Sequence, residues 1–189
     1  MPQHIRVTFD QAFERLINVE RGFTNDPKDH GNWTGGRQGV GQLKGTKYGI
    51  AANTYPDLDI KSLTLERAKE IYFRDWWLKA GGDVFDSAIL YQLWQFAINA
   101  GMGTAKRCLQ RAVRVGDDGH VGPVTIAAVN AMDLNDVLLR LLAQEIRHYT
   151  SLRDGFLNFG RGWMNRVADQ LDYAAEDNID GQSSRRNEP

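Results

Sequence analysis

The hydrophobic pattern of the chain first repeats at helical spacing near its start. Thr8 and Gln11 form a capping-box pattern, which predicts that a helix begins just after Thr8. Gly22 supplies the expected end of this helix. The core-facing stripe between these two signals consists of Phe9, Ala12, Phe13, Leu16 and Ile17.

Further helices are predicted from residue 64 onward. Thr64 caps one that runs to about Ala80, and Asp86 caps the segment 87–101, which is apolar nearly all round and is expected to be the central buried helix. Thr104 is expected to cap the next helix, and Pro123 is expected to sit in the first turn of the one after it. The last two helices are expected over about 136–153 and 162–176.

Residues 31–49, "GNWTGGRQGVGQLKGTKYG", contain seven glycines and no helical period. Glycine permits tight turns, so this segment predicts a small β-hairpin region. The predicted fold class is therefore mainly α with one small β element. We expect one domain over 1–177, with one lobe at about 8–80 and a helical lobe at about 84–176, followed by a polar, disordered tail at 178–189.

Composition excludes several classes of protein. Of 189 residues, 42% are hydrophobic and 25% are charged, as in soluble globular proteins, and the net charge of -1 gives no basic field for nucleic acid or an anionic membrane. No apolar run approaches the length of a membrane span, and the N-terminus lacks the pattern of a signal peptide. The single cysteine, Cys108, is expected to be a buried structural thiol.

Metal and nucleotide motifs are missing from the sequence. The glycine-rich segment matches neither phosphate-binding pattern, and the four histidines show no paired spacing. Glu145 and His148 form one E-x-x-H pair, but a di-metal site needs two such pairs, so we expect this one on a solvated helix face. No metal or cofactor is therefore expected.

Glu20 is the exceptional residue of the first helix. It lies three residues after Ile17 and four after Leu16, so it continues the core-facing stripe where the pattern asks for an apolar residue. Burial and the negative end of the helix dipole would both raise the pKa of this carboxyl group. A carboxylic acid that stays protonated is what a general acid for glycoside cleavage requires. The alternative is a frayed helix end with Glu20 in water, paired with Arg21.

A glycosidase needs a second carboxylate, and the following loop offers two. Asp26 precedes Pro27 and could simply start a turn, whereas Asp29 stands at the entry to the glycine-rich segment. Either would face a helix-end acid across a cleft in the two-carboxylate arrangement of glycosidases. Spacing alone does not choose between them.

Five segments, in the same order along the chain, resemble the family 108 glycoside hydrolases. "VERGFTNDPKDHGN" followed by "GTKYGIA" is similar to the family's signature, with its Glu at Glu20, its Asp at Asp29 and its Thr-Lys-Tyr-Gly-Ile run at 46–50. "FAINAGMGTAKRCLQRAV", "DDGHVGPVTIAAVNA" and "FGRGWMNRV" resemble the family's C-terminal region, which is described as peptidoglycan-binding. The similarity covers roughly residues 8 to 175.

The resemblance implies a lysozyme-like, two-lobed fold and an N-acetylmuramidase of the phage endolysin type. It implies Glu20 as the acid, Asp29 as the residue that stabilises the transition state or directs a water, and Thr46 as a residue that holds this water. Tyr48 is expected to line the cleft, because sugars stack on aromatic rings. Asn99 is expected either to bind an acetamido group or to cap the end of its helix.

The expected partner is bacterial peptidoglycan, bound by a monomer without nucleic acid or stable membrane insertion. The family resemblance implies that the protein is made in the cytoplasm of a bacterial host and reaches the cell wall through a holin pore. Two alternatives remain: a lytic transglycosylase, which makes an anhydro sugar, and a catalytically silent wall-binding module. The paired aspartate and the Thr-Lys-Tyr-Gly-Ile run argue against both.

The chain departs from the family pattern at two places. Arg21 stands where the family usually has glycine, so Glu20 would lie next to a cation. The segment between Gly31 and Thr46 is longer than in the compact family form and is expected to extend the hairpin.

Overall fold

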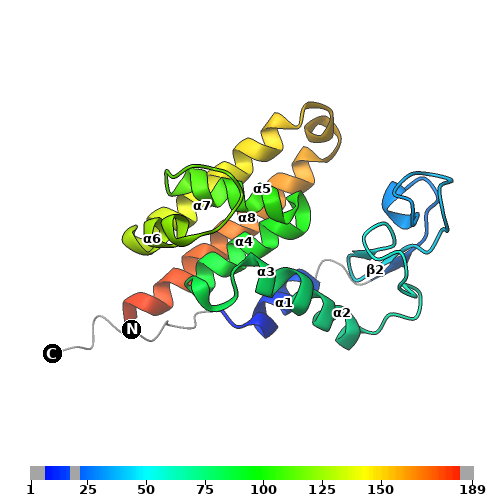
Figure 1. Cartoon of the computed structure of the whole chain (residues 1–189), viewed down its shortest axis with the longest axis horizontal. Coiled ribbons are helices and arrows are strands. Elements are labelled where there is room, and N and C mark those ends of the chain that lie inside the picture. Colours follow the sequence, from blue (N-terminus) through cyan, green and yellow to red (C-terminus); the bar gives the residue numbers. More distant parts are fainter. Residues whose placement is uncertain (1–6, 18–21, 184–189) are drawn as a thin grey trace. The chain divides into compact units, whose positions relative to one another are not determined.

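The computed structural model describes residues 7–17 and 22–183, with the side chains of all of these except 179–183. The chain divides into two compact units (Figure 1). We call Asp10–Arg74 the sheet-bearing unit, and Met1–Phe9 together with Asp75–Pro189 the helical unit. The fold is mainly helical with a small antiparallel sheet, which confirms the predicted fold class.

The sheet-bearing unit is built from two helices and three short strands. Helix α1 (Phe9–Ile17) is followed by β1 (Phe23–Thr24), the 3₁₀ turn η1 (His30–Asn32), β2 (Thr46–Lys47), β3 (Ile50–Ala51) and helix α2 (Leu65–Tyr72). The strands form one antiparallel sheet in the order β1-β2-β3. The two helices contact each other through the rings of Phe13 and Tyr72, whose centroids lie 5.9 Å apart.

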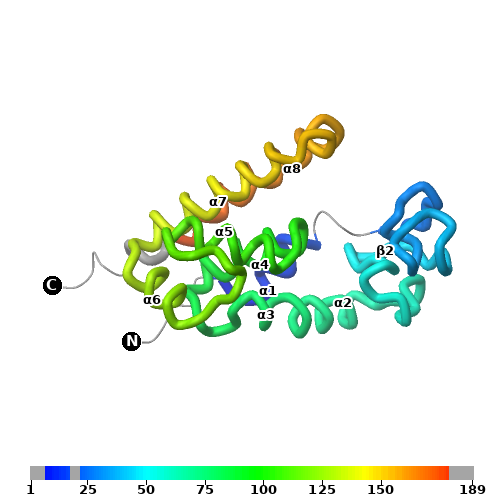
Figure 2. The backbone as a smooth tube through the Cα atoms, turned by 45° about the horizontal axis from the view of Figure 1, so that its top comes forward, coloured from blue at the N-terminus to red at the C-terminus, as the bar shows by residue number. Residues whose placement is uncertain are grey.

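In the helical unit, one central helix is buried by the helices around it. A π-helical turn (Phe73–Trp77) that crosses the unit boundary leads into α3 (Leu78–Ala80), η3 (Gly82–Val84) and α4 (Ser87–Ala100), whose residues from Ala88 to Ala97 are all buried. Helix α4 is packed by α5 (Met102–Ala112), α7 (Leu134–Ser151) and α8 (Arg153–Ser183). Helices α7 and α8 lie side by side, and the short helix α6 (Pro123–Ala131) precedes them (Figure 2).

Local capping signals placed several helix starts correctly. The Thr64 hydroxyl accepts a hydrogen bond from the backbone N–H of Arg67, and Asp86 accepts one from Ala88, as expected of N-caps. Pro123 is the first residue of α6. The thiol of Cys108 is buried, as predicted. Within the described residues, none of the helices has the length and apolar character that crossing a membrane demands.

Three boundaries differ from the sequence-based expectation. Thr104 does not cap a helix, because α5 already begins at Met102 after Gly101, whose φ of 86° ends α4. The last helix begins at Arg153, directly after α7, and runs to Ser183, beyond the expected start of a disordered tail at residue 178. The packing of α8 along α7 stabilises the helical conformation of glycines and polar residues that would favour a loop in an isolated peptide.

Aromatic rings join the start of the chain to the core of the helical unit. The Phe9 ring lies 5.4 Å from the ring of Trp77 and 6.1 Å from that of Trp94, which are themselves 5.6 Å apart. All three contacts are edge-to-face arrangements, which aromatic pairs favour. The backbone N–H of Val7 also donates a 3.0 Å hydrogen bond to the Ser87 hydroxyl.

Candidate functional site

The Thr-Lys-Tyr-Gly-Ile run forms a tight hairpin in the sheet-bearing unit. Thr46 pairs with Ala51 and Lys47 with Ile50, so Tyr48 and Gly49 are the two loop residues. Their φ values are 52° and 73°, and a two-residue type I′ turn requires positive φ at both positions. The sequence-predicted hairpin therefore lies at 46–51, at the end of the glycine-rich segment.

Asp29 begins the turn η1 that leads into this segment. Its Oδ1 accepts a 2.8 Å hydrogen bond from the backbone N–H of Gly31, as the N-cap of the turn. The side chain is exposed, and among the described residues no hydrogen bond reaches its Oδ2. Asp29 thus has one fixed oxygen and one that faces solvent.

Asp26 makes the same kind of local turn. Its Oδ1 accepts a 2.9 Å hydrogen bond from the backbone N–H of Lys28, and its side chain is exposed like that of Asp29. The turn predicted before Pro27 is therefore present. Geometry does not separate the two aspartates, so the choice of Asp29 still rests on its match to the family 108 signature.

Asn32, which the sequence analysis did not single out, holds the site together. Its side chain is fully buried, at 0% exposure. Its Nδ2 donates to the backbone oxygen of Asp26 at 3.0 Å, and its Oδ1 accepts from the Thr46 hydroxyl at 2.7 Å. Its backbone oxygen accepts from the N–H groups of Lys44 and Gly45. One side chain therefore fastens the aspartate loop to strand β2.

The role of Thr46 follows from this contact. Its hydroxyl hydrogen is donated to Asn32, so the hydroxyl oxygen keeps its lone pairs for a further donor. The side chain is half-buried, and Thr24 of β1 is its partner across the sheet. Thr46 can therefore accept a hydrogen bond from a water, but it also satisfies a buried amide.

Tyr48 is half-buried and held by its backbone. Its carbonyl oxygen accepts a 3.1 Å hydrogen bond from the Tyr72 hydroxyl, which ties the hairpin to α2. The Lys47 Nζ lies 5.3 Å from the centre of its ring. Its proposed contact with a sugar stays a prediction.

Two further predicted site residues are not described within the sheet-bearing unit. Asn99 belongs to the helical unit, where its Nδ2 donates to the Gln95 backbone oxygen at 2.8 Å and its Oδ1 accepts from Arg166. Its role in binding an acetamido group also stays a prediction. Glu20 lies outside the described residues, between α1 and β1 in the sequence.

A cavity of about 430 Å³ opens in the sheet-bearing unit beside β1. Phe23 contributes an aromatic ring that is 39% exposed, and Asn25 and Asp57 add polar groups. Asp59, also in the lining, has its pKa lowered by hydrogen bonds from Ser62. An exposed ring beside hydrogen-bonding groups suits a ligand with an apolar face and polar edges, such as a sugar.

The one E-x-x-H pair is not the solvated face that its spacing indicated. Glu145, on α7, is fully buried beside Gln170 of α8, and burial raises its pKa to about 7. His148 is half-buried, with its ring 5.6 Å from that of Phe96. Across the described residues, no group of three or more His, Cys, Asp or Glu side chains is arranged to hold a metal ion.

Comparison with known proteins gives a family match that spans most of the sheet-bearing unit and the first part of the helical unit. Residues 13–101 match the family model described as Glycosyl hydrolase 108. The family 108 resemblance is confirmed. This segment includes Glu20, Asp29, Thr46, Tyr48 and Asn99. The family is one of glycoside hydrolases, so the chain is assigned to that class of enzyme.

A solved structure is similar to this chain beyond the matched segment. The chain is similar to Brucella abortus SagA, with a TM-score of 0.75 and 28% sequence identity. The likeness covers 88% of this chain and 93% of that one, so it includes most of the helical unit. None of the curated protein sequences compared with this chain matches it.

The segment between Gly31 and Thr46, which is expected from the sequence to be longer than in the compact family form, is a hydrogen-bonded loop. Trp33 and Leu43 form a β-bridge at its base, and the N–H of Thr34 donates to the Gln42 oxygen at 2.9 Å. The Trp33 Nε1 donates to the Pro27 oxygen at 2.8 Å. The longer segment therefore braces the loop that carries the aspartates. Arg21, the other departure, lies outside the described residues.

Proposed function

We propose that this protein is a peptidoglycan hydrolase that cleaves the β-1,4 bond between N-acetylmuramic acid and N-acetylglucosamine. The observation that carries the proposal is the frame around Asn32, which fixes the loop of Asp29 and the hydroxyl of Thr46 from one buried side chain. The family 108 match over this frame supplies the class of reaction.

The catalytic roles follow from the chemistry of glycoside cleavage. Glu20 donates a proton to the leaving oxygen as the general acid. Asp29 presents its free oxygen to the positive charge that develops on the sugar, or takes a proton from the attacking water. Thr46 accepts one hydrogen of that water, because its own hydrogen is committed to Asn32.

The cavity beside β1 is proposed to bind part of the glycan. Phe23 would stack against the face of a sugar ring, while Asn25 and Asp57 would bond to its hydroxyl or acetamido groups. Phe23 is held in place by its contact with Gly45, where a Cβ atom would come within 2.8 Å of its ring. A preformed aromatic surface of this kind lowers the entropy cost of binding.

The proposed biological role is lysis of a bacterial cell from inside. The protein would be made in the host cytoplasm, act as a monomer and reach the peptidoglycan through a holin pore. This part of the proposal rests on the resemblance of the sequence to endolysins.

Mass spectrometry of digested, purified peptidoglycan tests the reaction. Muropeptides with ordinary reducing N-acetylmuramic acid ends are expected. Predominantly 1,6-anhydro ends would instead establish a lytic transglycosylase. New free amino groups without new reducing ends would mean that the protein cuts peptide or amide bonds, and a protein that binds peptidoglycan without releasing products would be a wall-binding module.

A matched pair of variants tests the site. Asp29→Asn and Asp26→Asn each remove one charge and keep the side-chain oxygen that accepts the backbone hydrogen bond of the turn. Glu20→Gln and Asp29→Asn should each reduce turnover by about 10²-fold or more, whereas Asp26→Asn should retain most activity. Circular dichroism would confirm folding. An inactive Asp26→Asn beside an active Asp29→Asn would show that the other aspartate is catalytic.

A further inference from the structure

A second cavity, of about 340 Å³, lies between α5 and α7 in the helical unit. Its lining includes Arg111 and Arg114 from the end of α5, and Arg140, Gln144 and Arg147 from α7. Four guanidinium groups thus gather on a protein whose net charge is -1. All of these residues lie beyond residues 13–101, the segment that the family 108 model matches.

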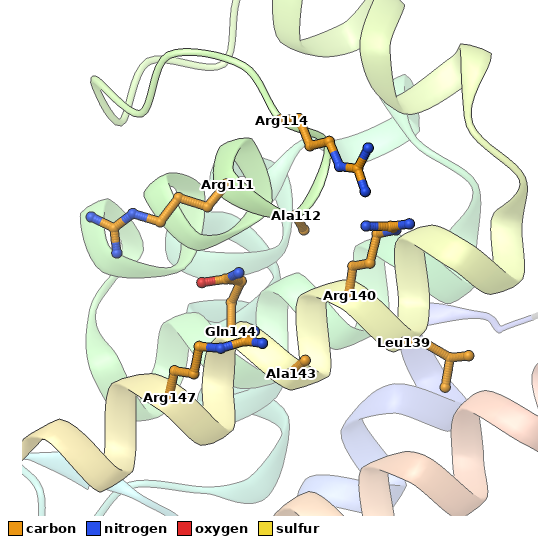
Figure 3. Close-up of a pocket in the computed structure, with 8 residues that line it drawn as sticks. All are labelled: Arg111, Ala112, Arg114, Leu139, Arg140, Ala143, Gln144 and Arg147. Carbon is orange, nitrogen blue, oxygen red and sulfur yellow. The ribbon is translucent and has the colours of Figure 1, made fainter.

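Two of the four guanidinium groups, those of Arg114 and Arg140, are directed toward each other. Figure 3 shows the side chains of Arg114 and Arg140 pointing at each other from opposite sides of the cavity, while the side chain of Arg111 points away. Two like charges that face each other repel, and an anion between them would turn this repulsion into attraction. The arrangement of Arg114 and Arg140 is therefore that of an anion site.

The backbone at Arg114 adds independent support. The N–H of Val115 donates to the Gln110 oxygen and the N–H of Arg114 to the Arg111 oxygen, which together make a Schellman motif at the end of α5. Arg114 occupies the left-handed position of this motif, with a φ of 62°, where glycine is usual. A strained residue that carries a charged side chain into a cavity is a mark of function.

The cavity also carries uncompensated charge. Arg111 is paired with Asp117 at 2.5 Å, and Arg140 has Asp136 at 3.8 Å. In the described part of the chain, the other two arginines have no acidic side chain within salt-bridge distance. Two positive charges therefore remain, which favours a ligand that carries two negative charges.

We propose that this cavity binds a phosphate group, held by Arg114 and Arg140 with Gln144 and Arg147 at its edge. The planar guanidinium fork matches the oxygens of phosphate, and a phosphomonoester supplies the two negative charges. The phosphate belongs to a small molecule or to a lipid headgroup. A nucleic acid is disfavoured, because its binding depends on many phosphate contacts along an extended basic surface. This proposal does not depend on the muramidase activity.

Calorimetric titration of the full-length protein with inorganic pyrophosphate at low salt tests the site. The wild type should bind pyrophosphate, and added sodium chloride should weaken the binding. Arg114→Gln and Arg140→Gln should each reduce the affinity by about tenfold or more, since each removes a charge-assisted hydrogen bond. Arg140→Lys keeps the charge but not the fork, so its affinity should fall between those of the wild type and Arg140→Gln.

Arg161→Gln is the matched control, because Arg161 is exposed on α8 outside the cavity. Its affinity for pyrophosphate should equal that of the wild type. No pyrophosphate binding by the folded wild type, or an equal loss in Arg161→Gln, would overturn the proposal. Preferred binding of a short DNA duplex that the cavity variants leave unchanged would also overturn it.

Vesicles distinguish the two sources of phosphate. Retention of the protein by vesicles that contain phosphatidic acid, but not by phosphatidylcholine alone, and release by pyrophosphate would make a lipid headgroup the ligand. Binding of pyrophosphate without retention by either vesicle would make it a soluble phosphate. Both outcomes support the site, provided that Arg114→Gln abolishes them.

Discussion

The buried carboxyl group of Glu145 gives the sharpest test of the structure. Its side chain is 0% exposed, and its Oε1 accepts a 3.1 Å hydrogen bond from the Nε2 of Gln170. Its Oε2 has no hydrogen-bond partner among the described residues, and neither has the nearby hydroxyl of Tyr149. A charge at this position would be poorly compensated, so we predict that Glu145→Gln stabilises the protein at high pH.

The magnitude follows from the pKa. Burial raises the pKa of Glu145 from 4.5 to about 7, against the opposing effects of the Gln170 hydrogen bond and the charge of Arg166. From α5, Cys108 also interacts with this carboxyl group, and its own pKa is raised by burial. At 1.36 kcal/mol for each pH unit, the difference between 4.5 and 7 corresponds to about 3 kcal/mol of unfolding free energy.

The sign of the pH dependence is fixed by which state holds the proton. Between pH 4.5 and about 7, folded Glu145 stays protonated while the unfolded chain releases its proton. The unfolding free energy of the wild type should therefore fall as pH rises through this window and should level off above it. Asp118 acts in the opposite sense, because hydrogen bonds from Gln110 and the His120 backbone lower its pKa, but its contribution changes below about pH 4.

Urea unfolding at pH 5, 6, 7, 8 and 9, followed by circular dichroism, measures the effect on the full chain. Glu145→Gln should match the wild type near pH 5 and exceed its stability by about 3 kcal/mol at pH 8 and above. Asp169→Asn, on the exposed side of α8, is the control and should follow the wild type. If Glu145→Gln and the wild type lost stability in parallel from pH 5 to 8, the claim that burial disfavours ionisation of the Glu145 carboxyl group would be refuted.

Four further predictions concern the two units. Asp29→Ala should lower stability by about 1 kcal/mol relative to Asp29→Asn, because it removes the cap of η1, while both should be inactive on peptidoglycan. Thr46→Val should cost about 1–3 kcal/mol in unfolding free energy by leaving buried Asn32 without its donor, and Thr46→Ser should restore most of it. Arg114→Gly should raise the melting temperature by relieving the left-handed backbone while it weakens pyrophosphate binding measured by calorimetry. Phe23→Ala should raise the KM for glycan fragments with kcat retained, and an unchanged KM would remove the cavity beside β1 from the substrate path.

Features determined by neighbours in the sequence could be predicted from the sequence alone. The caps at Thr64 and Asp86 are hydrogen bonds to backbone groups two or three residues away, so no distant contact is needed to place them. The apolar character of 87–97 likewise required burial wherever the helix packed. The Thr-Lys-Tyr-Gly-Ile run and its spacing from the aspartates pointed to the family that residues 13–101 match.

Features that depend on distant partners were decided only by the tertiary structure. Asn32 is polar and lies in a glycine-rich loop, so its burial follows only from its hydrogen bonds to Asp26 and to Thr46, fourteen positions further along the chain. Glu145 continues the apolar stripe of α7, three residues after Leu142 and four after Leu141, but only the packing of α7 against its neighbouring helices shows that its carboxyl group is removed from water. Arg114 carries no signal for a left-handed conformation, because its helix end is closed by backbone hydrogen bonds that any residue can make. Periodicity records where a helix is apolar, but the burial of a polar or charged side chain depends on partners that the fold brings from elsewhere in the chain.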